Sequence, residues 1–126
     1  MTLPITNPDM TRFFFTIEEA VKLIYRCLDA PAGVIVSQAM KSVTLGDLAE
    51  VMRGDSEIEN VGERPGEKHH ELLLTEEERQ KSAFDDGLFF YSPQGENVLP
   101  TVKEYSSETA VRMTQDELRQ VLKEYL

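Results

Sequence analysis

In this chain of 126 residues, four threonines stand before segments of helical pattern, and each is followed three residues later by an acidic residue. The four are Thr16, Thr44, Thr75 and Thr114. A threonine so placed caps a helix, because its side chain accepts a hydrogen bond from the third helical residue, whose acidic side chain can bond back to the cap. The pattern predicts four well-delimited helices and therefore a folded domain.

Helix and strand patterns alternate in the first half of the chain. Apolar residues recur at helical spacing over 17–29, which predicts a helix. The run GVIVS (33–37) is apolar and rich in β-branched residues, which is typical of a strand buried on both faces of a parallel sheet. With a helix after Thr44 and a strand within SEIENVGE (56–63), residues 33–63 are expected to form a β-α-β unit.

The rest of the chain carries weaker patterns. A short helix is expected after Thr75, and LFFY (88–91) is typical of a strand. Residues 93–110 show no period, so we expect a wrapped loop or an extended tail before the last helix. Residues 1–11 contain two prolines and are expected to be an irregular or extended lead-in.

These patterns together predict a mixed α/β fold, namely a small β-α-β-containing domain with flanking helices. The length fits a single domain over residues 1–126. Within it, residues 17–92 are expected to form the α/β body, and residues 93–126 a wrapping tail with the C-terminal helix.

Charge and composition restrict the classes of function. The net charge of −10 argues against nucleic-acid binding and against adhesion to an anionic membrane, although a few arginines in a cleft can still attract a small anion. No apolar run is long enough to span a membrane, and no secretory signal is visible. The single cysteine, Cys27, cannot form an internal disulfide and is expected to be buried within a helix, so a cytoplasmic location is expected.

The side chains of a complete enzyme are not found in this sequence. No Gly-rich nucleotide-binding loop is present, and no tyrosine is followed by a lysine four residues later. His69 and His70 are adjacent, so their side chains diverge and a shared metal site is not expected. We therefore expect no catalytic residue, no cofactor site and no metal site in this chain.

One segment combines the residue types that bind phosphates and sugars. In GERPGEKHHE (62–71), Pro65 and Gly66 shape a turn. Arg64 offers a planar set of donors that suits phosphate oxygens, and Glu67 offers an acceptor for sugar hydroxyls. The alternative is a solvated surface loop.

A second segment, DMTRFFFT (9–16), carries an arginine just before the first predicted helix. Arg12 stands where its guanidinium could be held over a cleft. The alternative is an ordinary ion pair with Asp9 or Glu18.

Three segments in order carry a resemblance to a known family. They are PITNPDMTRFFFTIEEAVKLI, ERPGEKHHELLLTEEE and EYSSETAVRMTQDELRQVL. The chain resembles the C-terminal part of UDP-N-acetylglucosamine 4,6-dehydratases and of capsular polysaccharide biosynthesis proteins of the epimerase/dehydratase type. Both belong to the extended short-chain dehydrogenase/reductase superfamily.

The resemblance implies that the two parts of the family's enzymes have different roles. The family's N-terminal Rossmann part binds NAD or NADP and carries the catalytic Tyr-x-x-x-Lys pair, while its C-terminal part forms one wall of the UDP-sugar site. The catalytic residues are thus expected upstream of Met1, and this chain alone is expected to be inactive. By the same resemblance, Arg12 and Arg64 contact the diphosphate and Glu67 the uridine ribose. Lys68 and Glu71 fall within the motif without an assigned contact, and His69 replaces a residue that is usually hydrophobic.

The expected partners are a UDP-sugar and either the N-terminal Rossmann half or a second copy of the chain. Self-association is considered because Phe13, Phe14 and Phe15 would be left exposed when the Rossmann half is absent. The alternative function is that of a stand-alone acidic interaction module that keeps the fold without binding the ligand.

Overall fold

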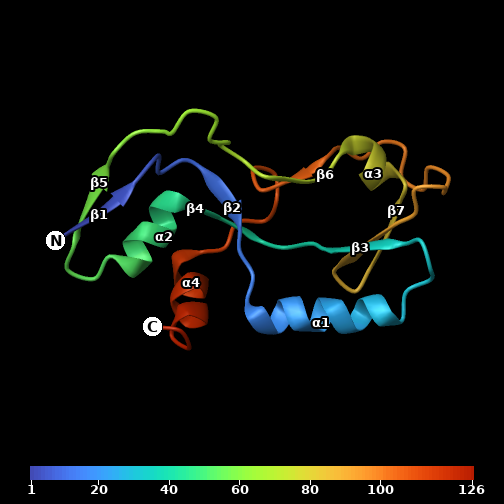
Figure 1. The fold of residues 1–126 in the computed structure, drawn as a ribbon, viewed down its shortest axis with the longest axis horizontal. Helices are drawn as coiled ribbons and strands as arrows, with labels where there is room; N and C mark the ends of the chain where they lie inside the picture. The colour runs from blue at the N-terminus through green and yellow to red at the C-terminus, as the bar shows by residue number, and fades with distance from the viewer.

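We describe residues 1–126, the whole chain, from a computed structural model. Figure 1 shows an elongated arrangement, with β1, β5 and α2 toward one end and α3 and β7 toward the other. The elements in chain order are β1 (Thr2–Ile5), β2 (Thr11–Phe13), α1 (Ile17–Leu28), β3 (Ile35–Gln38), β4 (Ser42–Thr44), α2 (Leu45–Met52), β5 (Glu57–Asn60), β6 (Leu72–Leu74), α3 (Glu76–Gln80), β7 (Ser82–Asp85), β8 (Leu88–Tyr91), β9 (Tyr105–Ser106) and α4 (Gln115–Leu122).

The four predicted helices are all present, and each begins directly after its threonine. Thr16 and Thr75 form complete capping boxes with the acid at the third helical position. Thr44 and Thr114 accept the backbone hydrogen bond of that position. These caps are interactions within a few residues, and for this reason the sequence predicts the helix starts correctly.

The strands form four small sheets. The first of them pairs two strands that are far apart in the sequence. Strand β1 lies parallel to β5, with Thr2 opposite Glu57 and Ile5 opposite Asn60. The sheets β2-β4, β3-β8-β7 and β6-β9 are antiparallel. Residues 1–11, expected to be irregular or extended, thus contain a paired strand, which no local pattern indicates.

The predicted β-α-β unit over residues 33–63 is wrong in its pairing. Strand β3 pairs antiparallel with β8, while β5 pairs with β1, so the two strands of the predicted unit lie in different sheets. Strand β3 is also at the edge of its sheet, and Ile35 is 54% exposed rather than buried. Apolar composition predicts a strand, but it does not specify the partner that would cover it. The fold class itself, mixed α/β, is confirmed by the elements and by the structural relative described below.

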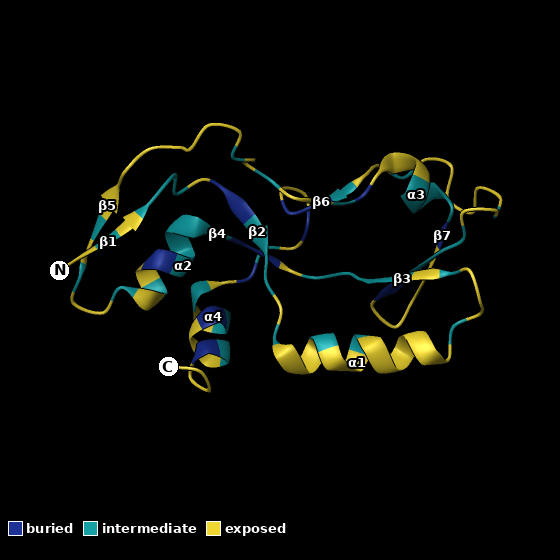
Figure 2. Ribbon diagram, in the orientation of Figure 1, coloured by how far each residue is buried: buried dark blue, intermediate teal, exposed yellow.

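The core lies where α2, α4 and β4 meet. Val43 and Leu118 are fully buried there, and Met113 packs with them. Figure 2 shows this buried centre around β2, β4 and α4, in contrast to the exposed surface of α1. Next to the core, Gly46 in α2 packs so closely on Pro8 that an added Cβ would lie 3.2 Å from the Pro8 carbonyl oxygen. That contact closes the start of α2 against the segment between β1 and β2.

Cys27 is exposed on α1, so the prediction of a buried cysteine is wrong. Helix α1 has a clear apolar side, yet none of its residues is buried. A helical pattern identifies the apolar side, but it cannot show whether this chain also supplies a surface to cover it. No helix of the chain combines the length and the apolar character that crossing a membrane requires.

Candidate functional site

Arg12 on β2 reaches across to the segment that follows β5. Its Nη2 donates to the carbonyl oxygen of Lys68 (2.7 Å), and its Nη1 donates to the carbonyl oxygens of Thr11 (2.8 Å) and His69 (3.2 Å). Its side chain is 26% exposed, and Nη2 lies 3.9 Å from Oε1 of Glu67. Arg12 therefore holds the backbone of the 62–71 segment, and its acidic neighbour is Glu67 rather than Asp9 or Glu18.

Glu67 closes the turn that Pro65 and Gly66 shape. The backbone N–H of Glu67 donates to the carbonyl oxygen of Arg64 (3.0 Å), and the N–H of Arg64 donates to Oε2 of Glu67 (3.2 Å). Oε1 of Glu67 accepts a hydrogen bond from Thr6 Oγ1 (3.3 Å). Gly66 has φ of +79°, a backbone conformation that glycine adopts without strain. The turn is thus fixed from within and from the segment between β1 and β2.

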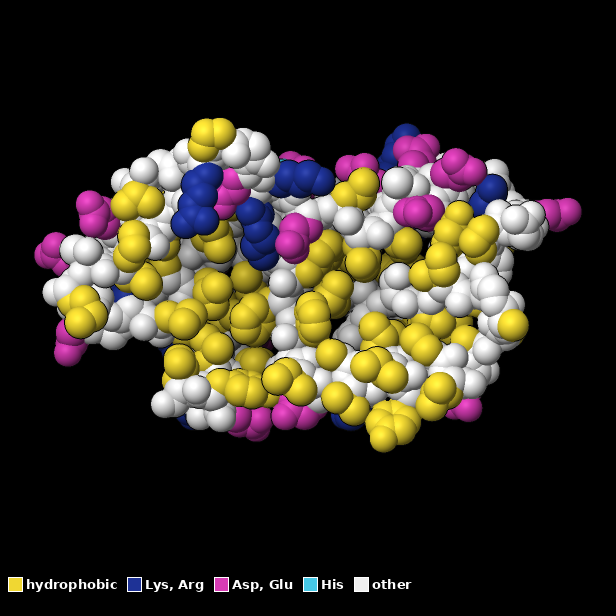
Figure 3. Space-filling model, in the orientation of Figure 1, with side chains coloured by type: hydrophobic (Ala, Val, Ile, Leu, Met, Phe, Trp, Pro, Cys, Tyr) yellow, Lys and Arg dark blue, Asp and Glu magenta, His cyan; other side chains and the backbone are white.

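The side chain of Arg64 is exposed at this turn, beside Glu67. The structure therefore brings the three predicted site residues into one region: Arg12 and Glu67 by a side-chain approach, Arg64 and Glu67 by backbone hydrogen bonds. Figure 3 shows basic side chains gathered near the segment that links β5 to β6. Glu63, Glu67 and Glu71 lie in the same region, so its charge is mixed, and attraction of a small anion would depend on which arginines face it.

A second contact ties the same segment to the region before β2. Glu63 accepts hydrogen bonds from Asn7 Nδ2 (2.6 Å) and from the ring of His69 (2.9 Å). These bonds, the one from Asn7 first, lower the pKa of the Glu63 carboxyl below its ordinary value. His69, the departure from the family pattern, therefore has a polar partner instead of an apolar pocket.

A buried polar network lies beneath the loop. Thr11 Oγ1 is 2.7 Å from Ser107 Oγ and 2.7 Å from Nδ1 of His70, and Ser107 Oγ also donates to the carbonyl oxygen of Thr11. Glu71 accepts from the backbone N–H of Phe13 (2.8 Å). This network, formed across 96 residues of sequence between Thr11 and Ser107, was not predicted, because no local spacing indicates it. It fixes β2, and with it Arg12, against the loop and β9.

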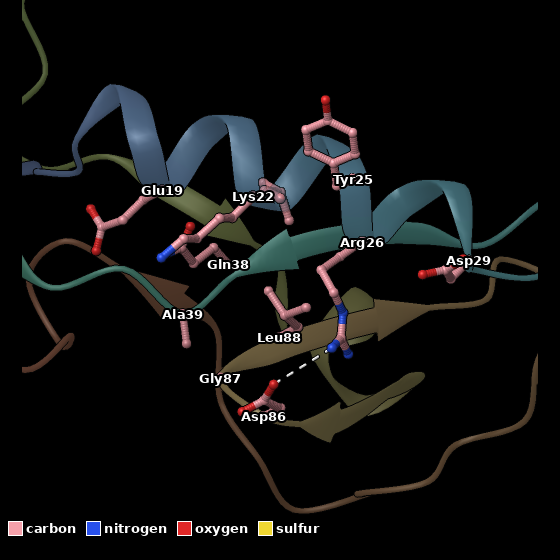
Figure 4. A pocket seen from close by; sticks show the side chains of 11 residues that line it. Glu19, Lys22, Tyr25, Arg26, Asp29, Gln38, Ala39, Asp86, Gly87 and Leu88 are labelled. Carbon is pink, nitrogen blue, oxygen red and sulfur yellow. Dashed lines mark ion pairs between the residues drawn. The ribbon is translucent and has the colours of Figure 1, made fainter.

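A cleft of about 520 Å³ lies elsewhere in the molecule. It is formed between α1 and the β3-β8-β7 sheet, and Figure 4 shows Arg26 reaching from α1 toward Asp86, an ion pair of 3.6 Å. Glu19, Asp29 and Lys22 also line it, so three acidic side chains face two basic ones and the cleft has no excess of positive charge to attract an anion. None of the predicted site residues faces this cleft, and we assign it no ligand.

No group of three or more His, Cys, Asp or Glu side chains is arranged to hold a metal ion. The start of α2 is also unsuited to a dinucleotide phosphate. A phosphate cradle at a strand-to-helix turn needs open space above a glycine. At the β4–α2 turn that space is filled by Pro8 against Gly46.

Comparisons with known proteins place these features in a family. The model of the family "Polysaccharide biosynthesis protein" matches residues 1–92. An uncharacterized membrane protein of Methanocaldococcus jannaschii is 36% identical, over 95% of this chain and 40% of its own length. A UDP-glucose 4-epimerase of Rickettsia bellii is 29% identical over the same shares.

A solved structure shows the same fold. The X-ray structure of Pen from Bacillus thuringiensis superposes with a TM-score of 0.84 and 26% sequence identity, over 98% of this chain and 40% of that one. The chain thus spans about two fifths of the length of the relatives it matches. These likenesses fit the C-terminal part of an extended short-chain dehydrogenase/reductase of the epimerase/dehydratase type, as the sequence motifs indicated. The chain belongs to the polysaccharide biosynthesis protein family.

Proposed function

We propose that this chain provides the UDP-sugar-binding portion of a polysaccharide-biosynthesis epimerase or dehydratase. The observation that carries the proposal is the convergence of Arg12, Arg64 and Glu67 at one turn that β2 and Glu67 itself hold in place. Family membership supports the class of ligand, since relatives of this chain include UDP-glucose 4-epimerases.

In this proposal, the exposed guanidinium of Arg64 binds the diphosphate. A planar guanidinium presents parallel N–H donors to two phosphate oxygens. Arg12 adds positive charge beside Glu67 and holds the turn in place through the carbonyl oxygens of Lys68 and His69. Positioning by fixed backbone contacts costs no reordering when the ligand binds.

In the same proposal, the Glu67 carboxylate accepts a hydrogen bond from a ribose hydroxyl. Each of its carboxylate oxygens accepts one hydrogen bond within the protein, from Thr6 or from the Arg64 backbone. A carboxylate oxygen has more than one acceptor direction, so both oxygens keep capacity for a sugar hydroxyl. A neutral ribose suits this position, because the phosphates would be repelled by the carboxylate.

The chemistry of the whole enzyme is proposed to lie outside these residues. The family's NAD or NADP would be bound by its Rossmann part, which also carries the acid/base pair. We propose no catalytic or cofactor-binding residue in this chain. UDP-N-acetylglucosamine is the proposed sugar nucleotide and the cytoplasm the proposed location.

Calorimetric titration of the chain with UDP-N-acetylglucosamine tests the ligand assignment. Arg64→Ala is expected to weaken binding at least tenfold, about 1.4 kcal/mol, since it removes a charged donor pair from the diphosphate. Arg119→Ala is the matched control, because Arg119 is an exposed arginine on α4 that pairs with Asp116. Equal affinity of the Arg64→Ala and Arg119→Ala variants would remove Arg64 from the site.

A second candidate function is that of an acidic interaction module without a ligand. The observation that favours it is helix α1, which has an apolar side and no buried residue. Stable association together with no measurable affinity for UDP or UDP-N-acetylglucosamine would select this function over the first.

A further inference from the structure

The charge around the proposed sugar-nucleotide site is evenly divided as long as its histidines are neutral. Three acidic side chains of the 62–71 segment lie there with three basic ones, and the six are Glu63, Glu67, Glu71, Arg12, Arg64 and Lys68. The diphosphate of a sugar nucleotide carries a negative charge on each phosphate. Because the site has no excess of positive charge, any charge added to this segment changes its affinity for the diphosphate in a defined direction.

His69 and Glu63 form a pair in this segment whose net charge changes near neutral pH. Nε2 of His69 lies 2.9 Å from Oε2 of Glu63, and Oε1 of Glu63 accepts a hydrogen bond from Asn7 Nδ2 (2.6 Å). Histidine is the side chain that gains a proton in the physiological pH range, while the carboxylate, whose pKa the same bonds lower, stays charged. The pair therefore carries one negative charge when His69 is neutral and no net charge when His69 is protonated.

The Glu63 carboxylate is held beside the residues that are proposed to bind the ligand. Glu63 directly precedes Arg64, so their Cα atoms are about 3.8 Å apart. Asn7, which bonds to Glu63, directly follows Thr6, which bonds to Glu67. Figure 1 shows the segment from β5 to β6 passing over the segment from β1 to β2, where these bonds are made. A change in the charge of the His69–Glu63 pair therefore acts on a diphosphate bound by Arg64.

The other charged or titratable groups around His69 do not cancel this effect. The centroid of the His70 ring is 6.3 Å from that of His69, and His70 has an acidic partner of its own, Glu108, at 3.8 Å. The guanidinium of Arg12 donates to the carbonyl oxygen of His69, and Lys68 precedes His69 as an exposed residue. Arginine and lysine side chains keep their charge where histidine titrates. Glu63 is thus the carboxylate that contacts the His69 ring.

We propose that the protonation of His69 sets the affinity of this site for a diphosphate ligand, and that binding of the ligand draws a proton onto His69. Protonated His69 neutralises Glu63, so the attraction between Arg64 and the diphosphate is no longer opposed by the neighbouring carboxylate. The effect is reciprocal, because two ligands of one protein change each other's affinity by the same factor. This inference rests on the proposed function, since it places the diphosphate at Arg64.

The sign and size of the effect follow from the charges. The diphosphate meets one negative charge fewer when His69 is protonated, so its affinity should rise as the pH falls. For charges roughly 8 Å apart in a solvated loop, the screened interaction corresponds to a factor of about two to three in the dissociation constant. By linkage, the bound ligand should raise the pH at which His69 loses its proton by about 0.3–0.5 pH unit.

Proton NMR of the histidine rings tests the proton uptake directly, because His69 and His70 are the two histidines of the chain. Their ring signals are followed from about pH 5 to about pH 8.5 with and without UDP-N-acetylglucosamine, and His69→Gln assigns them. This ligand is suitable because its phosphates are both esterified, whereas the terminal phosphate of UDP would itself titrate. The His69 transition should move to higher pH, and the His70 transition should move less. A His69 transition that does not move while the ligand binds, or an equal shift of both histidines, would overturn the proposal.

Two variants fix the charge at position 69. His69→Gln keeps a donor toward Glu63 without a charge, and His69→Lys carries a positive charge across the pH range. The His69 side chain is 50% exposed, so both variants should fold, which circular dichroism verifies. In calorimetry the unchanged chain should bind UDP-N-acetylglucosamine about two to three times more tightly at about pH 5.5 than at about pH 8. Each variant should bind equally at the two pH values, with His69→Lys the tighter of the two.

The outcomes separate this inference from the proposed function. If the unchanged chain binds the ligand with the same affinity at both pH values, the role of His69 is overturned and the ligand assignment stands. The same holds if both variants keep the pH dependence, because another group then causes it. If both variants lose binding at both pH values, His69 has a structural role only, and the inference is again overturned. No binding by the unchanged chain at either pH overturns the proposed function and this inference with it.

Discussion

Replacing Arg12 by alanine is expected to destabilise the chain mainly by freeing the 62–71 segment. The guanidinium donates two short hydrogen bonds to backbone carbonyls, 2.7 Å to Lys68 and 2.8 Å to Thr11, and a longer one to His69. A hydrogen bond from a charged donor contributes about 1.5–3 kcal/mol when fully buried. The Arg12 side chain is 26% exposed, so we take about 1 kcal/mol for each short bond.

The expected loss is therefore about 2 kcal/mol of unfolding free energy. With a urea dependence of about 1.5 kcal/mol per M, the midpoint of urea unfolding should fall by about 1.3 M. Hydrogen exchange should show the local effect, with faster exchange at the Glu67 amide, which donates to the Arg64 carbonyl.

Arg119→Ala is the control for loss of an arginine at the surface. Its guanidinium pairs with Asp116 on the same helix, and such exposed pairs contribute about 0.3–0.5 kcal/mol. If Arg12→Ala unfolds at the same urea concentration as Arg119→Ala, and the Glu67 amide keeps its protection, then Arg12 does not hold the loop. The guanidinium would in that case be free for a ligand, and the positioning role argued above would be refuted.

Three further predictions concern stability. Leu118→Ala should cost about 3 kcal/mol in urea unfolding, because Leu118 is fully buried in the core; a loss below about 1 kcal/mol would contradict that packing. Thr16→Ala should cost about 1 kcal/mol and reduce helicity by circular dichroism, whereas Thr16→Ser, which keeps the cap, should cost less. The hydrogen bond from Lys41 lowers the pKa of Glu117 below 4.5, so the Lys41–Glu117 pair stabilises the fold above that pH and this contribution is lost as the pH falls through the lowered pKa. The unfolding free energy of Glu117→Gln should therefore depend less on pH in the acid range. An acid dependence equal to that of the unchanged chain would speak against the pair.

Local interactions account for what could be predicted of the fold. The helix starts at Thr16 and Thr75 depend on side chains three residues away, and the structure confirms them. The pairing of β1 with β5, and of β3 with β8, depends on segments far apart in sequence, so the predicted unit over residues 33–63 placed its strands wrongly.

The candidate site likewise contains residues that could be predicted from the sequence and residues that could not. Arg12, Arg64 and Glu67 were selected by their chemistry and by the resemblance, and the structure brings them together. The residues that support them from below, Thr11 and Ser107, could not be predicted, because they meet only after the chain has folded.

The long separation of these contacts also bears on how the protein forms during synthesis. Arg12 bonds to a carbonyl 56 residues further along, and Thr11 to a serine 96 residues further along. At about 5–20 residues per second, a ribosome needs several seconds to supply the second partner after the first has emerged. Contacts of such span also slow the folding step itself. During this interval β2 can already pair with β4 and β1 with β5, but Arg12 and Thr11 still lack their partners. Slower translation would therefore lengthen the time for which this region is exposed to chaperones and proteases.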